Sequence, residues 1–502
     1  MGPEIFKYLL LITFVGLTFW LSWIGMQKAK SIKGFAIGNK DMSPILVGIT
    51  MASSTASTAL FVINPGFVYQ HGVSAYLHFT FAALGSFTAL IVLTKKFRKS
   101  GDSMGSITIP GWIYDRYKHR GLSLFFALTN LLMISFVVLI LVGSSLLLSV
   151  QFPVSPKAAL VCCLFFVFSY VLMGGVYAHA YTNAFQGVMM FVIAIFLFFQ
   201  GWKHFGGDIF GSLQGVSEHY ASVFNPESLL YPSVPNSLLY ADFVSVFLAS
   251  FVVTFALMLQ PHILTKVLYL KDDKQVTKFI GTSVVVGGAY TLTLFLGFYA
   301  QLSGVEVTRQ DLVVPTYLYQ EFSTGTFGPY ISSFITVTLL AAGLSTLDGI
   351  LVSLSAMTVN DIYHPFAKPE SPEIYARRGL MLSRLVLIAI GLVALVIAWN
   401  PPMLVGIFAQ QGIYALAAAS LVPILMGVVG PKGIHVYWIF ACAVVGLFGH
   451  LILNLSGIIF NPAVSSTYAI FASAFIYILG YIHARFIAKT LEPVEAAAEP
   501  QA

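Results

Sequence analysis

The sequence LLAAGLSTLDGILVSLSAMTVNDIYHP, from Leu339 to Pro365, decides the fold that we expect for the whole chain. It is apolar enough for a membrane-spanning helix, yet it carries Ser345, Thr346 and Asp348 near its middle. A carboxylate near the bilayer centre costs at least ~2.5 kcal/mol on insertion scales, so it is expected to have a function. Because oxygen ligands suit a hard cation, we predict that the segment supplies half of a sodium site. The alternative is that the hydroxyls only pack against a neighbour and the acid pairs with a distant lysine.

The composition is that of a polytopic membrane protein. Of the 502 residues, 58% are hydrophobic and 9% are charged, and the mean hydropathy is +0.85. Residues 5–26 predict a retained first helix, because Glu4 rather than a basic region precedes them and no small-residue cleavage site follows. The three cysteines, Cys162, Cys163 and Cys442, show neither a disulfide framework nor a metal spacing.

Apolar runs separated by polar breaks predict an all-α protein with about thirteen transmembrane helices. The expected spans are 5–27, 43–70, 76–95, 122–150, 156–176, 183–203, 240–265, 278–302, 327–360, 379–399, 402–428, 434–456 and 465–487. Residues 1–490 are expected to form a single transporter domain, and residues 491–502 a short disordered cytoplasmic tail.

The basic residues test this count, since each added or lost span would flip every later loop. Twenty-two of the 26 Lys and Arg residues fall on one set of alternate loops. That asymmetry predicts a multi-pass protein of the cell membrane with the N-terminus outside and the C-terminus in the cytoplasm. The net charge of +6 is then mostly a topology signal, and we expect no nucleic-acid partner.

Two of the spans carry polar and proline interruptions. The second has several hydroxyl residues followed by Asn64-Pro65-Gly66, and the seventh contains Gln260-Pro261-His262. Proline removes an amide and disfavours helical geometry before it, which frees carbonyls for a ligand. Interruptions at corresponding places predict a five-plus-five inverted repeat, here spans two to six and seven to eleven, with the sites at the midplane. The alternative is an ordinary kinked helix whose hydroxyls bond back to its own carbonyls.

With these residues in view, the chain resembles the sodium/solute symporter family, whose members transport proline, pantothenate, monocarboxylates, sialic acid and sugars. The resemblance rests on the span count and on motifs spread over most of the length: Pro65-Gly66, Tyr170 to Gln186 with Gly174-Gly175 and Thr182-Asn183, Gln260-Pro261-His262, and the opening segment. It implies a leucine-transporter-type fold, alternating access, and co-transport of sodium without an organic cofactor. Carried over by position, the family's sodium ligands correspond to Ser53, Ala56, Ala342, Ser345 and Thr346.

One departure from the family pattern concerns a second cation. Family members commonly have Thr-Asp after the double glycine, and in the sialic acid transporters that Asp helps to bind a second sodium. This chain has Asn183 there, and Asp348 stands where one of the hydroxyls of that second site belongs. We therefore predict a second cation site between Asn183 and Asp348, for sodium or a proton.

The expected substrate is a small organic acid or amino acid. Proline transporters of the family place aromatic residues just before the Gln-Pro-His run, whereas this chain has Val253 and Leu257, which makes proline doubtful. No intramembrane Arg or Lys is available to clamp an anion, but amides at an unwound helix could hold a carboxylate. The predicted substrate-binding residues are polar and uncharged: Thr55, Ser57, Gln260, Gln410 and Gln411.

Three other functions are weighed against transport. An enzyme would need convergent acid, base or metal groups, but His179, His262 and His450 are scattered, so we expect no enzyme activity. A solute sensor acting through a separate signalling partner is the main alternative, and a passive channel is disfavoured because the sites look occluding. The expected partners are a small-molecule substrate and the lipid bilayer, with no obligate protein partner.

Overall fold

The computed structural model describes residues 2–28, 41–104, 108–218, 239–367, 371–402, 404–431 and 433–496, and these residues form helices without strands. Eleven helical stretches in the described ranges are long and apolar enough to cross a membrane. The two remaining predicted spans correspond to the shorter apolar helices Pro44–Thr55 and Val244–Leu257. The predicted all-α membrane fold of about thirteen spans is therefore confirmed.

The α-helices follow one another with short connections. Their bounds are α1 Pro3–Lys28, α3 Pro44–Thr55, α4 Asn64–Met104, α5 Ile109–Tyr117, α6 Arg120–Thr129, α7 Ile134–Gln151, α8 Pro156–Gly201, α9 Ile209–Glu218, α11 Ala249–Leu257, α12 Pro261–Leu264, α13 Asp273–Tyr290, α14 Phe295–Leu302, α15 Val313–Phe322, α16 Gly328–Met357, α17 Pro372–Ala398, α18 Val405–Val429, α19 Val436–Leu455 and α20 Pro462–Ala496.

Three of these helices differ from the expected boundaries. Helix α8 covers two predicted spans, and α4 joins the end of the second span to the third. The bend within α4 is at Gly72, whose φ of 60° lies in the region that favours glycine. Helix α20 runs to Ala496, so it includes the first residues of the predicted tail, and the rest of that tail lies outside the described residues.

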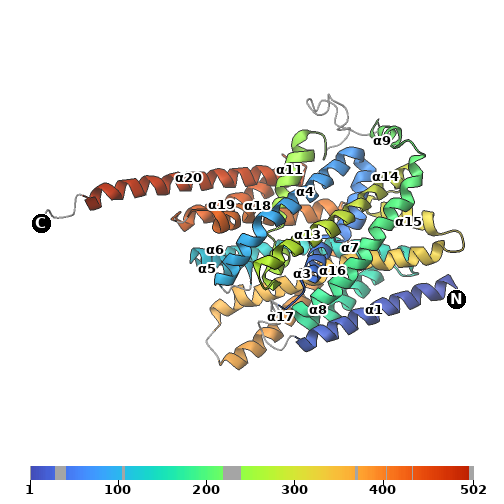
Figure 1. The fold of residues 1–502 in the computed structure, drawn as a ribbon, viewed down its shortest axis with the longest axis horizontal. Coiled ribbons are helices and arrows are strands. Elements are labelled where there is room, and N and C mark those ends of the chain that lie inside the picture. The colour runs from blue at the N-terminus through green and yellow to red at the C-terminus, as the bar shows by residue number, and fades with distance from the viewer. Residues whose placement is uncertain are drawn as a thin grey trace.

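Helix α16, which contains most of the opening segment, lies at the centre of the bundle. It packs against α8, α7, α1, α17 and α3. Helix α1 lies along α8 at one edge of the molecule, whereas α19 and α20 form the opposite edge (Figure 1). The outer helices expose large apolar side chains such as Trp20, Trp23, Phe475 and Ile482, which suit contact with lipid rather than water.

The packing of the first helices mirrors that of the later ones. Helix α3, from the second span, packs against α13 of the eighth, and α11, from the seventh, packs against α4 of the third. In a repeat of spans two to six in spans seven to eleven, the second span corresponds to the seventh and the third to the eighth. The two contacts are therefore equivalent, as such a repeat requires. Both interrupted helices therefore lie at the interface between the halves.

The two helix breaks differ in their relation to proline. Helix α3 ends at Thr55, and Ala56 has non-helical angles of φ −96° and ψ 78°. The chain then re-enters a π-helix, η1, at Ala59–Ile63, so the break lies well before Pro65 and not at it. Pro261, by contrast, is the first residue of α12, directly after the break that ends α11. Proline thus marked the second interruption correctly, but only the neighbourhood of the first.

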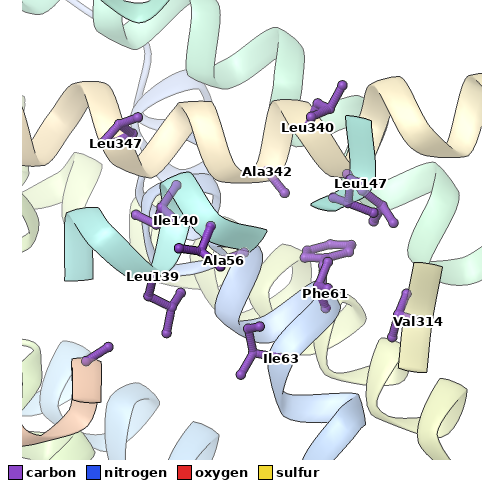
Figure 2. Close-up of a cluster of buried hydrophobic side chains, with 14 of the residues drawn as sticks. Ala56, Phe61, Ile63, Leu139, Ile140, Leu147, Val314, Leu340, Ala342 and Leu347 are labelled. Carbon is purple, nitrogen blue, oxygen red and sulfur yellow. The ribbon is translucent and has the colours of Figure 1, made fainter. Parts of the chain in front are cut away.

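Apolar side chains hold the break in α3 against its neighbours. Ala56 and Phe61 belong to one buried cluster with Leu139 and Ile140 of α7 and Ala342 of α16 (Figure 2). Small residues at this contact let the backbones of α3 and α16 approach closely, as at other helix contacts in membranes. The unwound turn is therefore packed by protein on the side that faces α7 and α16.

The contact between α1 and α8 allows a test of this packing. A Cβ on Gly25 would overlap the backbone of Ala178 on α8, whereas one on Gly16 would meet no atom within 4 Å. We expect Gly25→Val to destabilise the protein by about 1–3 kcal/mol, the usual cost of overpacking. Thermal unfolding of the detergent-solubilised protein measures this, with Gly16→Val as the matched control on the same helix. Equal unfolding midpoints for the two variants would contradict the close α1–α8 contact.

Candidate functional site

The hydroxyls of Ser345 and Thr346 reach across to the end of α3. The Ser345 hydroxyl lies 3.2 Å from the Ser53 carbonyl oxygen and 2.9 Å from that of Ala342, to both of which it can donate. The Thr346 hydroxyl donates to the carbonyl oxygen of Ser54 at 3.3 Å. Both side chains are fully buried. Hydroxyl and carbonyl oxygens of two helices therefore converge where α3 stops being helical.

This convergence concerns the five residues that the sequence assigns to sodium. The hydrogen bonds above join Ser345 to Ser53 and Ala342, whereas Thr346 bonds to Ser54, the residue after Ser53. Ala56 is buried at the break itself. Neutral oxygen donors of this kind are what a hard monovalent cation takes as ligands. The alternative, in which the hydroxyls of the helix bond to its own carbonyls, also holds for part of α3. Thr50 and Ser54 donate to carbonyls one turn earlier.

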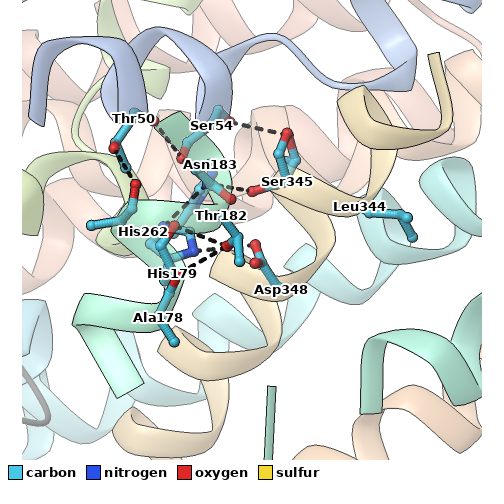
Figure 3. Close-up of polar contacts among 12 residues, drawn as sticks. Thr50, Ser54, Ala178, His179, Thr182, Asn183, His262, Leu344, Ser345 and Asp348 are labelled. Atoms are coloured by element: carbon cyan, nitrogen blue, oxygen red, sulfur yellow. Dashed lines mark hydrogen bonds and ion pairs between the residues drawn. The ribbon is translucent and has the colours of Figure 1, made fainter. Parts of the chain in front are cut away.

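Asn183 on α8 lies directly beside this contact. Its side-chain amide donates to the Ser345 carbonyl oxygen at 2.8 Å and to the Ser54 hydroxyl at 3.1 Å (Figure 3). Asp348 lies one turn further along α16, with its Oδ1 atom 3.2 Å from Nδ1 of His179. The partner of this acid is thus a histidine of α8, and not the distant lysine of the alternative.

Two buried oxygen atoms in this group have no hydrogen-bond partner. They are Oδ1 of Asn183 and Oδ2 of Asp348. An unpartnered buried oxygen is costly, and a carboxylate oxygen especially so. The predicted second site therefore has oxygen atoms free for a cation, although one oxygen of Asp348 is already held by His179.

A cavity of about 220 Å³ opens on the other side of the break in α3. Four of the predicted substrate-binding residues line it, namely Thr55, Ser57, Gln260 and Gln410. It is smaller than the roughly 300–1,000 Å³ of sites for drug-sized ligands, so it suits a small solute. Its walls come from α3, α4, α7, α13 and α18 and from the break between α11 and α12.

Gln411, the fifth predicted substrate-binding residue, does not line the cavity with the other four. Its side chain donates to Oδ1 of Asn454 on α19 at 2.9 Å instead. On a helix, adjacent residues point in different directions, and Gln410 takes the cavity-facing position. We therefore leave Gln411 out of the binding site proposed below.

Sequence reasoning missed the aromatic part of the cavity wall. His78, Phe79, Phe87, Phe136, Tyr290 and Tyr414 line the cavity. The chain contains 43 Phe and 24 Tyr residues, most of them within apolar runs, so aromaticity alone does not separate the cavity wall from lipid-facing positions. In the sequence His179 is one of several scattered histidines, and its pairing with Asp348 depends on the register between α8 and α16.

The sequence matches the model of the sodium:solute symporter family over residues 35–433. The sodium/pantothenate symporter of Haemophilus influenzae is 26% identical over 465 residues, which cover 91% of this chain and 92% of the relative. The osmoregulated proline transporter of Bacillus subtilis is 24% identical over 393 residues, covering 76% of this chain and 75% of the relative. The sodium/proline symporter of Staphylococcus aureus strain Newman is 24% identical, covering 75% and 71%.

Solved structures show the same fold. A sodium-coupled sialic acid symporter in a substrate-bound outward-open state superposes with a TM-score of 0.75 at 14% identity, over 94% of this chain and 97% of the other. The nucleobase-cation-symport-1 family transporter Mhp1, in a closed conformation, gives 0.56 at 14% identity over 91% and 95%. The chain therefore has the leucine-transporter-type fold with its five-plus-five inverted repeat, and it belongs to the sodium:solute symporter family.

Proposed function

We propose that this sodium-coupled transporter takes up a small organic acid or amino acid by alternating access, with sodium moving inward. The observation that carries the proposal is the contact of the Ser345 and Thr346 hydroxyls with the carbonyls of Ser53 and Ser54 at the break in α3. An ion held there would tie α16 to the interrupted helix, and its release would let the two separate. Ser53, Ala56, Ala342, Ser345 and Thr346 are the proposed sodium ligands.

The solute class is supported by the cavity and by the relatives. Proline, pantothenate and sialic acid, named for three similar proteins, each carry one carboxylate. The cavity is lined by polar uncharged side chains and aromatic rings, and it adjoins the unwound end of α3. Backbone groups freed by the break would bind the polar end of the solute, and the aromatic wall its apolar part.

The orientation follows from the distribution of charge. With the basic loops inside, the N-terminus is outside and the C-terminus is cytoplasmic, in the cell membrane. The Asn183–Asp348 pair is the proposed second cation site, because each residue offers an unpartnered buried oxygen. Inward sodium movement down its gradient would then drive the solute, and sodium and solute must raise each other's affinity by the same factor.

Uptake by proteoliposomes tests the proposal. Purified protein would be supplied with labelled L-proline, pantothenate, lactate, pyruvate, acetate and glucose, under an inward sodium gradient or with choline in place of sodium. We expect sodium-dependent accumulation of at least one carboxylate and none of glucose. Accumulation of glucose alone would contradict the solute class, and accumulation that ignores sodium would contradict the coupling.

The cavity assignment predicts different effects for two glutamines. Gln260 lines the cavity, and its buried Nε2 atom has no hydrogen-bond partner. We expect Gln260→Ala to raise the KM for the transported carboxylate about tenfold or more, since a hydrogen bond to a charged group contributes roughly 1.5–3 kcal/mol. Gln411→Ala is the control, because Gln411 faces Asn454 instead. Equal KM values for the two variants would contradict the assignment.

A further inference from the structure

A second, smaller cavity of about 80 Å³ lies near the cluster that contains Asp348. Its lining includes Lys266, His262 and His179, together with polar side chains of other helices, among them Thr108, Ser353 and Asn360. These residues come from the ends of helices that join the basic loops, on the side predicted to face the cytoplasm. The volume holds several waters or a small carboxylate group.

Lys266 places a buried basic side chain in the wall of this cavity. Its side chain is 1% exposed and donates to the carbonyl oxygen of His262, one turn earlier. No carboxylate comes within 4.0 Å of it in the part of the chain that the structure describes. The nearby acid, Asp348, is in direct contact with His179 instead, with 3.2 Å between its Oδ1 atom and Nδ1 of the ring. A buried ammonium is costly when no carboxylate contacts it directly, so an anion in the cavity would stabilise the charged form of Lys266.

His262 separates this cavity from the larger one. It lines both cavities, is 3% exposed, and its Nδ1 atom has no hydrogen-bond partner. Figure 3 shows His262 beside His179, at the side of the Ser345 and Asp348 group. The short helix α12 therefore forms the wall between the two spaces, with an unpartnered polar group in that wall.

We propose that the small cavity is a binding site for a carboxylate, occupied by the transported solute on its way from the larger cavity to the cytoplasm. Lys266 would pair with the carboxylate, and His262 and the hydroxyl of Ser353 would complete its hydrogen bonds. The assignment of the occupant rests on the proposed function, because it takes the solute to be an organic acid or amino acid. The site also explains how an anion is handled in a transporter whose main cavity, among the residues that the structure describes, is lined by no lysine or arginine.

Site-specific alkylation tests the site without requiring transport. Full-length protein carrying Cys162→Ser, which removes the exposed cysteine, and Ser353→Cys, which puts a thiol in the cavity, would be treated with N-ethylmaleimide in sodium-free buffer. Potassium acetate is the probe, and potassium chloride is the comparison. We expect acetate at ten times its half-protecting concentration to slow alkylation about tenfold, with little effect of chloride.

Protection by acetate is expected to depend on Lys266. Lys266→Met should raise the half-protecting acetate concentration by roughly tenfold to a hundredfold, the loss of one charge-assisted contact. Lys266→Arg should retain protection, and Lys271→Met, at an exposed lysine of the next loop, should leave it unchanged. If Lys266→Met does not fold, Lys266→Gln gives the same readout.

Several results would overturn the proposal. It fails if acetate protects the thiol from alkylation equally well in Lys266→Met and the parent protein, if chloride protects it as well as acetate does, or if acetate does not protect it. The proposal also fails if the thiol is not alkylated in acetate-free buffer. A failure of sodium-driven carboxylate uptake is a separate result, since alkylation is measured without sodium or transport. Uptake without protection would overturn only the small-cavity site. Protection without uptake would overturn the proposed function, and with it the transported solute as occupant, but not the carboxylate site itself.

Discussion

The double substitution Ser345→Ala, Thr346→Ala is expected to raise the sodium concentration for half-maximal uptake by at least a hundredfold. Each hydroxyl would contribute one contact to the ion, and a hydrogen bond or contact to a charged group contributes roughly 1.5–3 kcal/mol, or about tenfold to a hundredfold in affinity. The substitutions remove two oxygens from a fully buried position that water cannot fill easily. Sodium-dependent uptake in proteoliposomes, measured over a range of sodium concentrations, gives the result.

Ser355→Ala is the matched control for this prediction. Ser355 is on the same helix and is also buried, and its hydroxyl donates to the carbonyl three residues earlier at 2.9 Å, as that of Ser345 does. It therefore reproduces the local loss of a hydroxyl without touching α3. We expect its sodium dependence to match that of the parent protein. If the double variant also keeps the parent's sodium dependence, the proposed sodium ligands are wrong.

The fold was predictable because its signals are local. Hydrophobic runs set the spans, the buried acid marked α16 as unusual, and Pro261 marked the break between α11 and α12. The predicted position of the break in α3 was less accurate, since the sequence points to Pro65 but the helix stops at Thr55. The residues after Thr55 pack against α7 and α16, and the sequence of α3 alone does not contain that information.

The site was predictable only in part, because side-chain direction depends on how helices pack. The approach of Ser345 to the Ser53 carbonyl agrees with the expected pairing of α16 with the interrupted helix. Which of Gln410 and Gln411 faces the cavity depends on the rotation of α18. The pairing of His179 with Asp348 depends on a contact between residues far apart in the sequence.

Asp348→Asn should make the sodium dependence of uptake less steep, if Asp348 and Asn183 hold a second sodium. The change keeps the shape of the side chain but removes the charge that would hold the cation, and two donors replace one of the oxygens. With two sodium sites coupled to transport, the Hill coefficient can approach about two, and loss of one site brings it to about one. The measurement is uptake against sodium concentration, at a fixed concentration of the transported solute.

Asp361→Asn is the control for Asp348→Asn. Asp361 is also a buried acid in the segment that begins at Leu339, but its carboxylate accepts from the Thr108 hydroxyl at 3.0 Å and lies well beyond the sodium ligands in sequence. We expect that variant to keep the parent's Hill coefficient. An unchanged Hill coefficient and sodium affinity in Asp348→Asn would show that no second sodium binds there. Asp348 would then act as the partner of His179, and their contact would serve to join α16 to α8.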